Sequence, residues 1–318
     1  MLFRSVVDPT VTGLNVILAK GVNMIGKIPE HLIRFRSARY AWVSDVTKMY
    51  NQLHLNPGMY QYSLFLFHND LDPTAPPHVW VMVRAWYGVS STGNQSGVAV
   101  ERLAFCFKIE FPLAYAPLKD NRYVDDLMGG AKTPEERDQQ IEQVKACLAK
   151  GGFALKFVAI SGSPPPPKGT NDGRTVGCLG MSWDTLNDTL SPGFDQDFFV
   201  TRLKGQKPLP GVNLADRENL AKALVDGNLT RAGILSRVLS FYDPCGWWHP
   251  IVLQMKLAMI PINSLDWFAP IPQEHHAEWI RLFSIMQDAR SLEIPRSIVP
   301  ESARSEEHTS ELQSHHDL

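Results

Sequence analysis

Runs of apolar residues bounded by turn-forming residues predict several strands in the first half of the chain. Residues 41–45 form one such run and end in Asp45, so we expect a buried strand with an acid at its end. Residues 60–67 and 79–84 predict a hairpin with a long tip, and residues 153–160 predict a further strand.

Apolar residues at three- and four-residue spacing predict helices between and after these strands. One is expected over 95–107. Another is expected to begin at the capping box that starts with Thr133 and to end at Gly151-Gly152. A short helix is expected over 46–53, and the second half of the chain predicts helices over 213–226, 230–242, 249–259 and 274–292. The change from alternating strands and helices to helices alone predicts a first domain over 1–194 and a helical second one over 195–303.

The stretch Tyr123-Val124-Asp125-Asp126 predicts a hairpin with two carboxylates at its turn, because apolar residues flank it and Gly129-Gly130 closes it. Taken alone, an acidic turn exposed to water explains an Asp-Asp pair, and a helix N-cap explains Asp45. However, the order β-α-β-β-α-β from Trp42 to Ala159 is a split β-α-β plan, in which Asp45 would lie beside the hairpin. Three acids there suggest a divalent-metal site for nucleotidyl transfer.

A strand pair is also expected over 176–183 and 189–194, with Asn187-Asp188 at its turn.

Composition leaves the class of ligand open. The chain of 318 residues is 44% hydrophobic and 20% charged, with a net charge of −2. Leaving out residues 304–318, which hold one Arg and four acids, gives 30 basic and 29 acidic residues, so any basic surface must be a local patch. The four cysteines are far apart in sequence and predict neither a metal cluster nor a disulfide framework. With no signal peptide and no apolar run long enough for a bilayer, we expect a cytoplasmic protein.

Ordered blocks over residues 1–300 resemble the reverse transcriptase region of BEL/Pao-type LTR retrotransposon polyproteins. The blocks are Val7-Asp8-Pro9-Thr10 with Leu14-Asn15, Ser44-Asp45-Val46-Thr47-Lys48-Met49-Tyr50, Tyr87-Gly88-Val89-Ser90-Ser91, Tyr123-Val124-Asp125-Asp126, Gly151-Gly152-Phe153, Leu179-Gly180-Met181-Ser182-Trp183 and Phe241-Tyr242-Asp243-Pro244-Cys245-Gly246. The resemblance implies an α+β, right-hand polymerase fold, with partial fingers and a split β-α-β palm in 1–194 and a thumb- or connection-like part in 195–303. Residues 304–318 resemble a translated sequencing adaptor and are expected to be a non-native, disordered tail.

The resemblance implies an RNA-directed DNA polymerase that adds deoxynucleotides to a primer 3′-hydroxyl. Such a reaction uses two Mg²⁺ ions about 4 Å apart, for which Mn²⁺ can substitute. It assigns catalysis and metal binding to Asp45, Asp125 and Asp126, with the carbonyl of Val46 as a further ligand.

Further residues are matched to substrate contacts. The substrate-binding set is Arg4, Tyr50, Tyr87, Gly88, Tyr123 and Lys156, and the primer grip near 176–194 is Leu179, Gly180, Met181 and Trp183. Plainer roles stay open for several of them: core packing for Tyr50, Met181 and Trp183, and a solvated cation for Arg4 and Lys156.

The implied partners are an RNA or DNA template with its primer, dNTPs, and the protease, RNase H and integrase segments of the same Pol polyprotein, inside the cell or in a virus-like particle. We recognise no RNase H acid set in this sequence. Two other functions are weighed. One is an inactive or truncated fragment that only binds nucleic acid. The other is an aspartic peptidase region, which lacks support because neither Asp-Thr-Gly nor Asp-Ser-Gly occurs.

Overall fold

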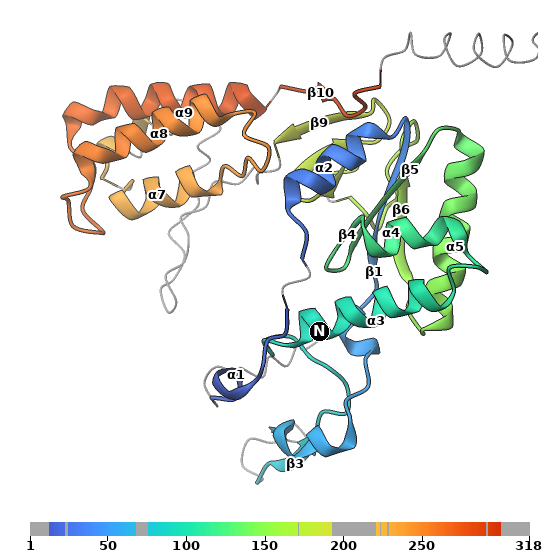
Figure 1. The fold of residues 1–318 in the computed structure, drawn as a ribbon. Coiled ribbons are helices and arrows are strands. Elements are labelled where there is room, and N and C mark those ends of the chain that lie inside the picture. Colours follow the sequence, from blue (N-terminus) through green and yellow to red (C-terminus); the bar gives the residue numbers. More distant parts are fainter. Residues whose placement is uncertain are drawn as a thin grey trace, which may run out of the picture. The chain divides into compact units, whose positions relative to one another are not determined.

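The computed structural model describes residues 13–22, 25–67, 76–170, 172–192, 221–222, 224–227, 229–290 and 292–299. Its contacts divide the chain into two units, one of residues 1–161 with 297–318 and one of residues 162–296 (Figure 1). The division falls before the hairpin that the sequence analysis grouped with the first domain. The boundary expected at residue 194 lies outside the described residues and stays a prediction.

A four-stranded antiparallel sheet forms the centre of the first unit, with the strand order β4-β5-β1-β6. The strands are β1 (Tyr40–Val46), β4 (Arg122–Tyr123), β5 (Asp126–Ala131) and β6 (Leu155–Ile160). Helix α3 (Thr92–Cys106) connects β1 to the β4–β5 hairpin, and α5 (Pro134–Lys150) connects β5 to β6. This is the chain order and strand order of a β-α-β-β-α-β unit.

One apolar core joins the sheet to its helices. Trp42 and Leu127 from the sheet are fully buried, and they belong to one cluster with Val100 of α3 and Val144 of α5. Figure 1 shows α3, α4 (Tyr115–Lys119) and α5 together on one side of the sheet. Helix α2 (Ile28–Ser37) contacts β4 and β5. The core therefore fixes β1 against the hairpin that carries the two aspartates.

The glycine pair at the end of the hairpin makes room for a tryptophan. A Cβ on Gly129 would lie 2.2 Å from Nε1 of Trp42 and 2.5 Å from Oε1 of Gln140. These two atoms are already joined by a hydrogen bond of 2.7 Å. Only a residue without a side chain can occupy this position, since real Cβ atoms do not approach so closely.

Two local predictions about the first unit have different outcomes. The capping box is confirmed, because Thr133 Oγ1 accepts a hydrogen bond from the backbone N–H of Glu136 at the start of α5. The helix expected over 46–53 is present only in part, as a 3₁₀ helix over Met49–Gln52, while Val46 still belongs to β1. Lys48 has φ 46°, in the left-handed region, and this conformation interrupts a right-handed helix.

The expected hairpin is present as β2 (Leu64–Phe67) and β3 (His78–Val81), which pair from Leu64–Val81 to Phe67–His78. Its strands are shorter than the expected 60–67 and 79–84, because residues 60–62 belong to a 3₁₀ helix, Pro57–Tyr62, and β3 ends at Val81. The short helix α1 (Leu14–Ile17) precedes α2.

Among its described residues, the second unit contains a four-stranded antiparallel sheet and the helices α7, α8 and α9. The sheet order is β10-β9-β8-β7, with β7 Thr175–Cys178, β8 Met181–Asp184, β9 Thr189–Pro192 and β10 Ile294–Pro295. The helices are α7 (Arg231–Ser240), α8 (His249–Met259) and α9 (His276–Arg290), which confirms three of the four expected there. Most of the fourth, 213–226, lies outside the described residues.

The strand expected over 176–183 is wrong, because it is two strands joined by a tight turn. Leu179 (φ 48°) and Gly180 (φ 83°) both adopt the left-handed conformation, which is the geometry of a two-residue hairpin turn. The turn at Asn187-Asp188 is confirmed, with Asp184 opposite Thr189 in the β8–β9 pair.

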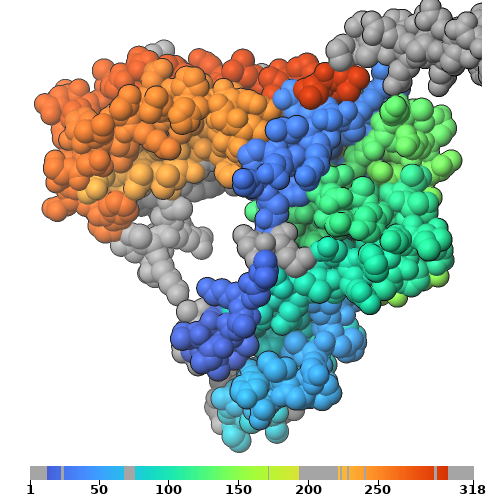
Figure 2. Space-filling model, in the orientation of Figure 1, coloured from blue at the N-terminus to red at the C-terminus, as the bar shows by residue number. Residues whose placement is uncertain are grey.

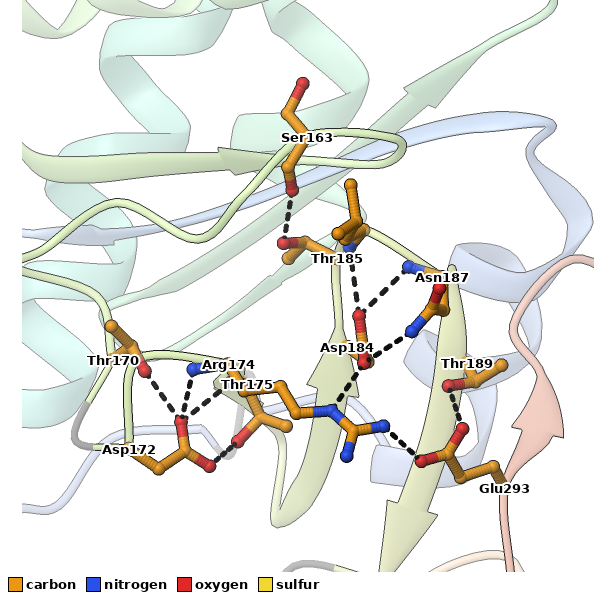
Figure 3. Close-up of polar contacts among 11 residues, drawn as sticks. Ser163, Thr170, Asp172, Arg174, Thr175, Asp184, Thr185, Asn187, Thr189 and Glu293 are labelled. Carbon is orange, nitrogen blue, oxygen red and sulfur yellow. Dashed lines mark hydrogen bonds and ion pairs between the residues drawn. The ribbon is translucent and has the colours of Figure 1, made fainter.

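A polar network joins the segment before β10 to strands β8 and β9 (Figure 3). Arg174 donates to Asp184 Oδ2 at 2.8 Å and to Glu293 Oε1 at 2.6 Å, and Thr189 donates to the other oxygen of Glu293 at 3.1 Å. Nearby, the fully buried Arg296 donates from Nε and Nη2 to the two carboxylate oxygens of Asp188, at 2.6 and 2.8 Å. Two arginines, one exposed and one buried, therefore tie distant segments together.

Candidate active site

The end of β1 brings Asp45 next to the β4–β5 turn. In the β1–β5 ladder Asp45 lies directly opposite Asp126. On the other side of β1, the register with β6 shifts between Ser44 and Val46, so an irregularity in the ladder lies at Asp45. Such bulges re-aim a side chain, and they are frequent beside active sites.

The turn itself consists of Val124 and Asp125, because Tyr123 pairs with Asp126 on either side of them. The backbone carbonyl of Asp125 accepts a hydrogen bond of 2.9 Å from the N–H of Val46. The structure therefore brings the three predicted acids together at one end of the sheet, two on paired strands and one on the turn. We call this end, which consists of Asp45, Val46, Asp125 and Asp126, the β4–β5 edge.

The carboxylates of this edge affect one another electrostatically. Burial raises the pKa of Asp126 to about 6, and the negative charges of Asp125 and Asp45 add to the rise. Burial also raises the pKa of Asp125, with a further contribution from the charge of Asp45. Lys156 acts in the opposite direction on both, and its Nζ lies 3.2 Å from Oδ2 of Asp45. Three acids and one ammonium group therefore share one site.

The raised pKa of Asp126, caused first by burial and then by the neighbouring charges, predicts that neutralising this acid stabilises the metal-free protein. The folded-state pKa lies above the ordinary value, so the protonated acid stabilises the fold at low pH, and this contribution is lost as the pH rises through about 6. At pH 7 in the presence of a chelator, we expect Asp126→Asn to increase the free energy of unfolding by on the order of 1 kcal/mol. Urea unfolding at several pH values measures the effect. An advantage of the variant that does not grow between pH 4 and pH 7 would contradict this explanation.

The donor atoms at this edge fit Mg²⁺ by chemistry, because carboxylate and carbonyl oxygens are the ligands that this hard cation prefers. Across the described ranges, no three His, Cys, Asp or Glu side chains are grouped so that they could hold an ion. Asp45 is instead paired with Lys156. The ligand set Asp45, Val46, Asp125 and Asp126 therefore stays a prediction.

Two of the expected substrate-binding tyrosines lie together near the acids. The rings of Tyr50 and Tyr87 are 5.0 Å apart between centroids. Burial raises the pKa of Tyr50, and the charge of Asp125 contributes, so Tyr50 is close enough to the turn to be influenced by it. The core-packing alternative for Tyr50 also has support, since its side chain packs against the apolar cluster of the first unit.

The loop that contains Gly88 is held by a residue without an assigned role in the sequence analysis. Asn15 donates from Nδ2 to the carbonyl of Gly88, and its Oδ1 accepts from the N–H of Ser90, both at 2.8 Å. The block Leu14-Asn15 was matched to the family, but only the three-dimensional contact shows what the amide does. Tyr123 meets His31 edge to face, with ring centroids 6.1 Å apart.

The remaining predicted residues lie elsewhere. Arg4 falls outside the described residues. The predicted primer grip lies in the second unit, where Leu179 and Gly180 form the β7–β8 turn. Met181 and Trp183 are buried, and Trp183 Nε1 donates to Asp188 at 2.9 Å, so both side chains take part in the core of that unit. Their contact with a primer stays a prediction.

Comparison with known proteins gives one family match. Residues 230–317 match the model of a Pao retrotransposon-like RNaseH-like domain. This description differs from the thumb-like interpretation of 195–303, and it covers a segment in which we recognised no RNase H acids. No curated protein matches the chain.

None of the helices described is long and apolar enough to cross a membrane.

The family match lies within the segment 195–303 and its tail, and the acids of the β4–β5 edge lie outside it. It supports an origin of the chain in the Pol polyprotein of a BEL/Pao-type retrotransposon.

Proposed function

We propose that the chain contains the catalytic part of an RNA-directed DNA polymerase. One observation carries the proposal: Asp45 lies directly opposite Asp126 across two paired strands, with Asp125 on the adjoining turn. A central strand and a neighbouring hairpin thus supply three carboxylates from residues about 80 positions apart. Nucleotidyl transfer needs such a set, because two cations must be held close together at the reacting phosphate.

Each residue of this edge has a role in the proposal. Asp45, Asp125 and Asp126 would hold Mg²⁺ with the carbonyl of Val46, and the bound metal would activate the primer hydroxyl and neutralise the triphosphate. Lys156, now paired with Asp45, would be released to contact phosphate oxygens when cations occupy the carboxylates. Tyr50 and Tyr87 would contact the sugar of the incoming nucleotide.

A cavity next to the turn offers space for a nucleic-acid strand. It measures about 330 Å³ and includes Lys20, Ser90, Asn94, Arg122 and Val124 in its lining. Lys20 and the polar groups there suit a phosphate backbone, because phosphate contacts position nucleic acid without reading its sequence, whereas the guanidinium of Arg122 is bonded to backbone carbonyls.

A second candidate function is RNase H-type cleavage of an RNA–DNA hybrid, which the family match over 230–317 favours. That chemistry also requires carboxylates that bind divalent cations. Among the described residues, neither this segment nor the β4–β5 edge has three acidic, His or Cys side chains grouped to hold a metal. We rank polymerase activity first because Asp45 lies opposite Asp126 with Asp125 on the adjoining turn.

A primed RNA template labelled on both strands separates the candidates. With Mg²⁺ and dNTPs, a polymerase lengthens the DNA primer, a nuclease shortens the RNA, and a binding module retards the hybrid without changing either strand. We expect primer lengthening that is lost with chelator. An unchanged primer with shortened RNA would contradict the polymerase and support a nuclease function of the RNaseH-like segment.

Tyr50 provides a prediction specific to a polymerase. If its ring blocks a ribose 2′-hydroxyl, Tyr50→Val should reduce the preference for dNTP over rNTP by roughly tenfold to a hundredfold, because the loss of one steric contact changes discrimination by about 1–3 kcal/mol. Tyr50→Phe retains the ring and serves as the matched control. Single-nucleotide incorporation measures kcat/KM for both substrates. Equal selectivity in the wild type and the Val variant would show that Tyr50 has only its packing role.

A further inference from the structure

The turn that carries Asp125 is strained. Val124 has φ 57°, in the left-handed region, and it is branched at Cβ, which makes this conformation unusual. Such a residue costs on the order of 1–3 kcal/mol and persists only where surrounding contacts determine the backbone. The structure must therefore contain groups that hold Val124 in place.

Arg122 supplies those contacts from within the same hairpin. Its guanidinium donates from Nη1 to the carbonyl of Val124 at 2.9 Å, from Nε to that of Leu118 at 3.2 Å, and from Nη2 to that of Gly97 at 3.3 Å. Leu118 belongs to α4 and Gly97 to α3, so one side chain connects the turn to two helices. Arginine suits this task because its donors form a rigid, planar fork.

Gly97 leaves the space that the guanidinium occupies. A Cβ built on Gly97 would lie 3.3 Å from Nη2 and 3.8 Å from Nη1 of Arg122. Helix α3 passes close to the guanidinium at this point, and Gly97 is buried. A glycine inside a helix is otherwise unfavourable by about 1 kcal/mol relative to alanine, so its presence here has a packing reason.

Both peptide groups next to Asp125 are fixed by hydrogen bonds. The carbonyl before it, that of Val124, accepts from Arg122, and its own carbonyl accepts from the N–H of Val46 at the end of β1. Two fixed peptide planes determine φ and ψ of the residue between them, and so the direction of its Cα–Cβ bond. The carboxylate of Asp125 is thereby aimed from both sides of the turn.

We propose that Arg122 is a positioning residue that fixes the direction of the Asp125 carboxylate by holding the strained Val124 peptide. It acts through the backbone and is not assigned a contact with substrate. The inference rests on the proposed polymerase function for its catalytic consequence. Its structural consequence, a turn held by the guanidinium, can be measured without activity.

The test compares Arg122→Lys and Gly97→Ala with the wild type, with Arg102→Gln as an exposed control on α3. The lysine keeps the charge but not the fork, and the alanine displaces the fork by crowding Nη2 while improving helix propensity. In Arg122→Lys and Gly97→Ala, hydrogen exchange of the Val46 amide, which bonds to Asp125, should accelerate about tenfold, and in Arg102→Gln it should not change. The kcat for primer extension should fall roughly tenfold to a hundredfold, with KM for dNTP nearly unchanged, because a small displacement of a catalytic group slows the chemical step.

The outcomes separate the inference from the proposed function. An unchanged melting temperature of Gly97→Ala, together with faster exchange at Val46, would exclude a simple loss of stability as the cause of its defects. Exchange at Val46 that stays within about twofold of the wild type in both variants would overturn the positioning role, whether or not the wild type extends primers. If both variants exchange Val46 faster but the wild type itself extends no primer, the positioning role would be supported and the polymerase contradicted.

Discussion

Replacing Asp125 by Asn is expected to reduce Mg²⁺-dependent primer extension by at least about a thousandfold. The amide is nearly isosteric with the carboxylate, so the fold should persist while the charge that binds cations is removed. A bound metal contributes several kcal/mol of transition-state stabilisation, and about 4 kcal/mol corresponds to a factor of a thousand. Because Asp45 and Asp125 are both assigned to the ions, Asp45→Asn should cause a similar loss, and the double variant little more.

The matched control is Asp120→Asn. Asp120 is an exposed acid five residues before Asp125, at the end of α4, and its backbone carbonyl accepts a hydrogen bond from Arg34. Its replacement should leave extension within about twofold of the wild type, since surface substitutions away from a site have small effects. Steady-state incorporation of labelled dNTP compares the wild type, the three variants of Asp45 and Asp125, and the control. Substantial residual activity in both Asp45→Asn and Asp125→Asn would remove these acids from the catalytic step.

The largest effect on stability is expected for Arg296→Met. Arg296 is fully buried, and its guanidinium binds both oxygens of Asp188, which also accepts from Trp183 Nε1. Removing the arginine leaves the Asp188 carboxylate, whose side chain is 26% exposed, without its counter-charge, and we expect a loss of about 3 kcal/mol, at the lower end for a buried pair. We expect the melting temperature to fall by roughly 10 °C.

Two further variants test this cause. In Asp188→Asn combined with Arg296→Met no charge is left in the site, so the double variant should be more stable than Arg296→Met alone. Asparagine tolerates the left-handed conformation that Asp188 adopts at φ 56°. Arg174→Met should cost less than Arg296→Met, because Arg174 is exposed and the carboxylate that it leaves, that of Asp184, keeps its hydrogen bonds from Leu186 and Asn187. Equal losses for Arg174→Met and Arg296→Met would contradict a special role of the buried arginine.

Local patterns predicted the elements that carry the candidate site. The apolar run before Asp45 and the apolar residues around Asp125-Asp126 each imply a strand or hairpin, and both are present as β1, β4 and β5. The capping box at Thr133 predicted helix α5. These signals lie within a few residues of one another, so a single sequence is sufficient to find them.

The errors arise at residues whose backbone conformation is not implied by their type. Lys48 and Leu179 both adopt positive φ, which is rare for residues with a side chain. Lys48 lies before the 3₁₀ helix and limits it at its start, and Leu179 follows the last residue of β7. The Gly180 that follows Leu179 was a signal for the second turn. No comparable signal precedes Lys48.

Long-range polar contacts could not be predicted from the sequence. Arg296 lies 108 residues from Asp188, and Asn15 lies 73 residues from Gly88. Nothing in the local sequence distinguishes these side chains from solvated ones, because their partners are brought near only by the packing of the sheets. Arg122 is different: it immediately precedes the signature Tyr123-Val124-Asp125-Asp126, yet its partners are backbone carbonyls that carry no sequence information.

The most direct test of the central claim is to locate the metal by cleavage of the backbone. Fe²⁺ bound in place of Mg²⁺, with ascorbate and peroxide, generates hydroxyl radicals that cut the chain close to the ion, and the fragments are identified by mass spectrometry. If Asp45, Asp125 and Asp126 hold the metal together, cuts should appear near residues 45 and 125 at once. Added Mg²⁺ and the Asp125→Asn variant should suppress both. Cuts confined to residues 230–299, or near only one of the two sites, would contradict a shared metal site at the β4–β5 edge.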